Sequence, residues 1–132
     1  MGASIAADSS LNGNDGRYTG GITLGLPGFH GGDTAALFDG RTGRIVVQIS
    51  ATDNPARITM EAKIRWDGPT DLQQRILEKE SFAGTTQYGL SVMPSGKLHV
   101  ELRARRALTI PLMVAESTDT VALGRNACSR HL

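Results

Sequence analysis

The sequence predicts an all-β protein, built as an antiparallel sandwich or jelly roll. Several segments alternate strictly between apolar and polar residues, which is typical of strands with one packed and one wet face. Turn residues recur at intervals of about ten residues. The chain also has 16 glycines in 132 residues, where average usage would give about nine. Its length fits a single domain over residues 1–132.

The N-terminal third is divided by glycine-rich turns, so that only short strands fit before residue 33. We expect strands at 17–19 and 22–24. A hairpin follows, in which Ala36 and Phe38 pair with the alternating Ile45, Val47 and Ile49 across a turn at 39–43.

The clearest alternation runs from Ile58 to Trp66, with an apolar face ending in the indole and a charged face between. Residues 73–79 are short and ambiguous, and within 71–80 a helix could be argued. Their place between two strands favours a strand. A second hairpin joins 88–92 to 98–102 across Met93–Lys97. Residues 107–132 are atypical and are expected to form a strand or an arm.

Composition excludes several classes of function. The net charge of +1 gives no strong field for nucleic acid, and the basic cluster of Arg103, Arg105 and Arg106 fits a solvated strand end as well as a polyanion site. The single cysteine, Cys128, excludes an intramolecular disulfide and a cysteine zinc site. There is no apolar run of about 18 residues and no signal-peptide pattern, so we expect no membrane insertion.

A set of short motifs resembles one known family in order and spacing. They are Ala7–Gly16, Gly25–Gly28, Ala36–Gly40, the strand ending in Trp66, Ile76–Lys79, Tyr88–Leu90 and Gly96–Leu98. Over about residues 6–103 the chain resembles the laminin-G-like, concanavalin A-like lectin domains of bacteria and phages. The resemblance implies a jelly-roll sandwich with adhesive or sugar-binding roles.

The resemblance ends at Val121–Cys128, where the family continues with a Trp-His-x-Val-Ala strand and a further hairpin. The last strands are therefore expected to be lacking. Three alternatives follow: a neighbour completes the sheets, the C-terminal region is rebuilt, or the reading frame is truncated. An incomplete sandwich exposes apolar faces and unpaired edges, which favours a homo-oligomer or larger assembly.

Candidate metal ligands cluster near the N-terminus. Asp8, Asn12, Asn14 and Asp15 place four oxygen-bearing side chains within eight residues, as Ca²⁺ requires; the resemblance also implies calcium. The alternative is that these residues only form tight turns. Asp39 could add a ligand or cap its own turn, and the turn is favoured.

The sequence predicts no enzyme and no catalytic residue. Glu78 and Glu80 would share a strand face at a glycosidase-like separation, but Lys63 and Lys79 are available as surface partners. No nucleophile elbow or metal-binding histidine spacing occurs. His99 is expected beside Glu101 as a solvated pair, and Trp66 in the core.

Two hypotheses for the function remain. The first is a non-enzymatic recognition or adhesion module that binds a glycan or protein from an extracellular or virion surface, with Tyr18, Arg103 and Arg105 as ligand-binding candidates. The alternative is a structural subunit, such as a virion decoration or tail component, that acts by self-assembly. A glycoside hydrolase is the least favoured reading.

Overall fold

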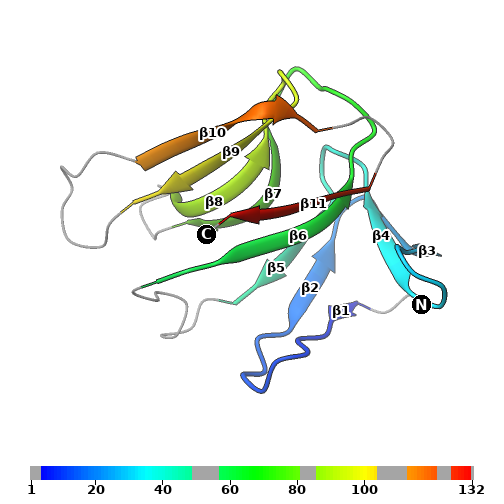
Figure 1. Ribbon diagram of the computed structural model, residues 1–132. Helices are drawn as coiled ribbons and strands as arrows, with labels where there is room; N and C mark the ends of the chain where they lie inside the picture. Colours follow the sequence, from blue (N-terminus) through cyan, green and yellow to red (C-terminus); the bar gives the residue numbers. More distant parts are fainter. Residues whose placement is uncertain (1–3, 49–56, 81–85, 104–112, 122–125, 132) are drawn as a thin grey trace. The chain divides into compact units, whose positions relative to one another are not determined.

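The protein is all-β and antiparallel, as predicted (Figure 1). The computed structural model describes residues 4–48, 57–80, 86–103, 113–121 and 126–131, and these contain eleven β-strands and no helix. Within these ranges, then, no helix is long and apolar enough to cross a membrane. The chain divides into two compact units, Met1–Ile58 and Thr59–Leu132. The grouping of both units into one domain stays a prediction.

The first unit contains five short strands. They are β1 (Ile5–Ala6), β2 (Gly16–Thr19), β3 (Ile22–Pro27), β4 (Thr34–Phe38) and β5 (Arg44–Val47). Strands β1, β2 and β5 form one sheet in that order, and β3 pairs with β4 in another. The chain thus leaves the first sheet after β2, forms the β3–β4 pair, and returns to the first sheet at β5.

The predicted pairing of residues 36–38 with 45–49 is wrong. Strand β4 pairs with β3 (Ile22 with Phe38), and β5 pairs with β2 (Thr19 with Arg44). The segment from 16 to 47 is therefore one long hairpin with a corner, at which Gly20 and Gly21 lie opposite the turn 39–43. Residues 49 and 50 lie outside the described part of the chain. Alternation identified the strands, but it carried no information on which strands pair.

The second unit contains the remaining strands. They are β6 (Met60–Arg65), β7 (Gln74–Glu80), β8 (Thr86–Val92), β9 (Lys97–Leu102), β10 (Met113–Thr120) and β11 (Asn126–His131). The order β10-β9-β8-β7 makes a four-stranded sheet, and β11 pairs with β6. The predicted hairpin at Met93–Lys97 is confirmed, with Val92 opposite Leu98.

The core of the second unit lies between β6 and the apolar face of the four-stranded sheet. Leu90 and Val92 on β8 are the most completely buried large side chains, at 2% and 1% exposed. Trp66 packs with Val92 and Val121 in one buried cluster, so its predicted core position is confirmed. The alternation of β6 is also confirmed, because Met60 is buried while Glu61, Lys63 and Arg65 are exposed.

The C-terminal region forms strands that pair within this chain. Strand β10 continues the sheet beyond β9, with Glu116 opposite His99, and β11 runs antiparallel to β6, with Ala127 opposite Ile64. Residues 107–112, which belong to the expected strand or arm, lie outside the described part. The described part of this region therefore forms paired strands.

Candidate functional site

Opposite its apolar face, the four-stranded sheet carries a continuous set of polar side chains. Side chains alternate between the faces of a strand, so the partners of the core residues point away from the core. We define the polar face as the residues Gln73, Arg75, Glu78, Gly89, Ser91, His99, Glu101 and Glu116.

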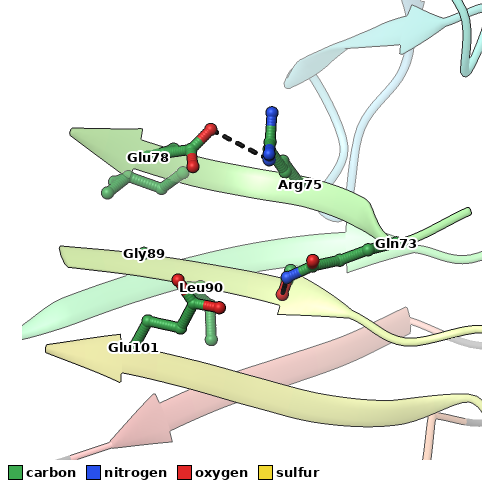
Figure 2. Close-up of a pocket in the computed structure, with 8 residues that line it drawn as sticks. Gln73, Arg75, Glu78, Gly89, Leu90 and Glu101 are labelled. Atoms are coloured by element: carbon green, nitrogen blue, oxygen red, sulfur yellow. Dashed lines mark hydrogen bonds and ion pairs between the residues drawn. The ribbon is translucent and has the colours of Figure 1, made fainter. Parts of the chain in front are cut away.

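Two rows of this polar face cross the strands. In the first, Arg75, Ser91, His99 and Glu116 are successive cross-strand partners from β7 to β10. In the second, Gly89 lies between Glu78 on β7 and Glu101 on β9. Figure 2 shows these two glutamates on either side of the strand that carries Gly89. Because glycine has no side chain, this position is a shallow hollow with carboxylates on both sides.

The β7 side of the hollow is held by a network of contacts. Arg75 Nε lies 2.9 Å from Glu78 Oε2, and the arginine side chain is 60% exposed whereas that of the glutamate is 16% exposed. Thr86 Oγ1 donates to the other carboxylate oxygen of Glu78 at 2.8 Å. Gln73 Nε2 donates to Ser91 Oγ at 2.6 Å. Glu78 is therefore fixed, while the guanidinium of Arg75 is accessible.

The β9 side is organised around His99, which contacts two carboxylates. Its Nε2 lies 3.0 Å from Glu101 Oε1 and its Nδ1 lies 3.3 Å from Glu116 Oε1. The predicted pairing with Glu101 is confirmed, but the expectation that the pair is solvated is wrong, because His99 is only 8% exposed. Ser91 and Glu116 lie opposite His99 on the two adjacent strands. Burial by residues of other strands cannot be predicted from a local sequence pattern.

The polar face does not have the geometry of a metal centre. The two carboxylates approach opposite nitrogens of the same imidazole, so the three groups cannot converge on one ion. Within the described residues, no group of three or more His, Cys, Asp or Glu side chains is arranged to hold a metal.

The predicted calcium ligands lie in the turn between β1 and β2. Asp8 accepts hydrogen bonds from Ser10 Oγ at 2.6 Å, Ser10 N at 2.8 Å and Asn14 N at 2.8 Å. Asp15 Oδ1 accepts from Asp8 N at 2.7 Å. The Ser10 hydroxyl, followed by the two backbone N–H groups, lowers the pKa of Asp8. Asp8 and Asp15 thus close the turn by their own hydrogen bonds.

Asp39 caps its turn, as the sequence favoured. Its Oδ1 accepts from Arg41 N, Thr42 N and Gly43 N at 2.8–2.9 Å, and Oδ2 accepts from Thr42 Oγ1 at 2.8 Å. These bonds, with Gly43 and Arg41 contributing most, hold the pKa of Asp39 far below its ordinary range. This cap forms the corner that redirects β5 away from β4.

The three candidate ligand-binding residues are not brought into one cluster by any described contact. Tyr18 is half-buried on β2, opposite Ile45. Arg103 follows β9 and its Nε donates to Thr86 O at 3.2 Å, which holds its side chain against the sheet. Arg105 lies outside the described residues, as does Arg106. Sequence reasoning missed the polar face, whose only local signal was the alternation of Ser91, His99 and Glu101 with the core residues.

Glu78 and Glu80, the pair considered for glycoside hydrolysis, both lie on β7. Glu78 belongs to the polar face, and the β7–β8 ladder shifts register between Lys79 and Glu80. Across the sheet, Glu78 and Glu101 lie on either side of Gly89, two strands apart.

The chemistry of the polar face is that of hydrogen bonding and charge. It offers carboxylates, a guanidinium, an imidazole and a carboxamide around bare backbone at Gly89. Comparison of the chain with family models, curated proteins and solved structures gave no significant match.

Proposed function

We propose that this protein is a non-enzymatic recognition module of an extracellular or virion surface, and that the polar face binds a glycan. The observation that supports this most is the second row, in which Glu78 and Glu101 flank the bare Gly89. Sugar hydroxyls both donate and accept hydrogen bonds, and the polar face offers both kinds of partner. Its groups are carried by the strands of one four-stranded sheet, a regular element that fixes their spacing.

Preorganisation supports the proposal further. Arg75 and Glu78 hold each other, and Ser91 is held by Gln73, so that few side chains must be ordered when a ligand binds. The accessible guanidinium of Arg75 stands at the rim of the hollow, where it can donate to a sugar oxygen. A protein surface rich in exposed hydroxyl or amide groups would use the same contacts.

The proposal includes a calcium ion bound by the turn between β1 and β2. An ion bound by Asp8, Asn12, Asn14 and Asp15 would have to replace the hydrogen bonds that the two carboxylates now accept. Calcium would then raise the melting temperature of the chain, and a chelator would reverse the rise. Light scattering in the same two conditions gives the oligomeric state.

The glycan proposal is tested with a glycan array followed by calorimetric titration of the best ligand. Gly89→Ala fills the hollow, and its new Cβ would lie 3.4 Å from Thr86 Cγ2, an ordinary contact that permits folding. Arg75→Gln removes the accessible donor. Each variant is expected to weaken binding about tenfold, the effect of one hydrogen bond to a charged group.

Arg65→Gln is the matched control, because Arg65 is an equally exposed arginine that pairs with Asp67 at 3.0 Å on β6 rather than on the polar face. It should bind like the native chain. An array on which the native protein binds no glycan, or an equal loss in the Arg65 variant, would contradict the proposal.

A second function, that of a self-assembling structural subunit, is favoured by the apolar surface of β5. Ile45, Val46 and Val47 are 41–46% exposed, although side chains of this type are usually buried. A virion decoration or tail component would cover such residues with copies of itself. A defined oligomer whose size does not change with calcium, and which binds no glycan, would favour this function over recognition.

A further inference from the structure

We propose that His99 fastens the edge strand β10 to the sheet in a proton-dependent manner, so that β10 is held firmly in mild acid and loosened at alkaline pH. The inference concerns the chain without a ligand and does not depend on the proposed function. It stands on the placement of one imidazole between carboxylates from two strands.

The two contacts match the donors of a charged ring. Nε2 lies 3.0 Å from Glu101 Oε1 and Nδ1 lies 3.3 Å from Glu116 Oε1. A carboxylate only accepts hydrogen bonds, and a neutral imidazole carries one N–H, whereas the imidazolium carries two. Only the protonated ring can donate to both glutamates. In the neutral ring, one nitrogen lone pair would face a carboxylate oxygen.

The other charged groups near His99 do not replace this arrangement. On β7, Arg75 and Glu78 pair with each other at 2.9 Å, and β8 presents the uncharged Ser91 at the position beside the ring. On β9, Lys97 lies two residues earlier, opposite Thr120 of β10. Among the described residues, the carboxylates in contact with the ring are thus Glu101 and Glu116.

Of these two contacts, the one with Glu116 crosses between strands. Glu101 belongs to β9, as His99 does, whereas Glu116 belongs to β10. Loss of the proton therefore removes an attraction between neighbouring strands or, if the ring keeps its Nδ1 proton, a contact within β9. In either tautomer the ring loses its charge, and with it the charge-assisted attraction to Glu116 across the two strands.

Strand β10 is the element on which such a change would act most. It is the edge of the sheet, and Met113 and Val114 are 69% and 51% exposed, so apolar burial contributes little to holding it. Its ladder with β9 shifts between Glu116 and Thr120, where Ser117 Oγ accepts from Leu98 N at 3.0 Å. The charged bridge adds to this backbone ladder at Glu116, beside the register shift.

The direction of this pH dependence follows from the chemistry of histidine. The bridge is complete when the ring carries both N–H groups and is lost when one proton leaves, so a rise in pH acts against it. Mild acid is therefore the condition in which β10 is most firmly attached.

The test is amide hydrogen exchange of the full chain, measured by NMR at pH 5.5 and pH 8 and corrected for the intrinsic exchange rate. Protection of the β10 amides is expected to fall about tenfold or more at pH 8, the effect of losing one charge-assisted hydrogen bond. Amides of β8, in the middle of the sheet, serve as the internal reference. The ring ¹⁵N shifts should report both His99 nitrogens protonated at pH 5.5 and one at pH 8.

Two variants separate the bridge from general effects of pH. His99→Gln cannot gain a charge and should lose the pH response of β10, while His30→Gln, in the β3–β4 turn, should retain it. If His99→Gln does not fold, Glu116→Gln removes the facing carboxylate and should reduce the response. Equal β10 protection at both pH values in the native chain, or an unchanged response in the Glu116 variant, would overturn the proposal.

Discussion

Gly96 lies against the indole of Trp66, so closely that a Cβ on the glycine would be 3.0 Å from Trp66 Cη2. Gly96 also has a φ of 82° and donates its backbone N–H to Met93 O at 2.8 Å. The β8–β9 turn and the core of the second unit thus share one contact. The turn residue is selected both by backbone conformation and by the ring beside it.

Gly96→Ala is expected to destabilise the protein by about 1–3 kcal/mol, because a side chain at positive φ is strained and the indole must also shift. Urea unfolding followed by fluorescence measures this directly, since Trp66 is the single tryptophan of the chain. Gly31→Ala is the control, because Gly31 has open space around it and no positive φ. A Gly96 variant as stable as the Gly31 variant would contradict the contact.

Gln74→Leu should destabilise the protein by about 1–3 kcal/mol, because Gln74 Oε1 accepts the indole N–H of the buried Trp66 and its loss leaves that donor unsatisfied. Trp66→Phe removes the donor itself. In a double-mutant cycle followed by circular dichroism, the two substitutions together should cost less than the sum of the single losses. Strictly additive losses would show that this hydrogen bond does not form.

Asp39→Asn is expected to make the protein less sensitive to acid. The pKa of Asp39 is lowered by hydrogen bonds from Gly43, Arg41 and Thr42, so the carboxylate stabilises the fold above its unfolded-state value of about 3.9. That stability is lost as the pH falls below this value. The native chain should therefore lose more stability than the variant between pH 5 and pH 2, measured by urea unfolding.

At neutral pH the same variant should be less stable than the native chain, because an amide presents one acceptor oxygen in place of two. Asp71→Asn, at an exposed position, serves as the control and should follow the native acid profile. An Asp39 variant with the native profile would refute the capping role.

Val46→Lys should shift any self-association of the chain toward the monomer. Val46 is 45% exposed on β5, and covering a valine in an interface contributes about 1.5–3 kcal/mol, so association should weaken at least about tenfold. Light scattering over a range of concentrations measures the effect. Gln48→Lys adds the same charge without removing apolar surface, and equal effects of both variants would mean that charge alone controls association.

Local pattern predicted much of this fold, but not its pairing. The β8–β9 hairpin was predictable because both strands and the Met93–Lys97 turn are contiguous, and the apolar face of β6 followed from alternation alone. The pairing of β4 was missed because Asp39 captures three backbone N–H groups and Gly20–Gly21 forms the facing corner. That competition between hydrogen bonds depends on residues about twenty positions apart.

The candidate site was less accessible to sequence reasoning than the strands. His99 and Glu101 stand two residues apart on one strand, so their contact was predictable. Glu116 and Arg75 reach the same polar face from β10 and β7, and their register is set partly by bulges near Leu77 and Glu116. No periodicity in the sequence encodes where such a bulge falls.

The sequence by itself determined the class of this protein, because alternation and glycine-rich turns commit a chain to antiparallel strands whatever its partners are. It also determined which faces are apolar, including that of Trp66. Only the tertiary structure decided that β4 turns away from β5, that β10 and β11 extend two sheets, and that His99 is buried between two glutamates. These features arise from hydrogen bonds and burial between distant segments, which exist only once the strands have paired.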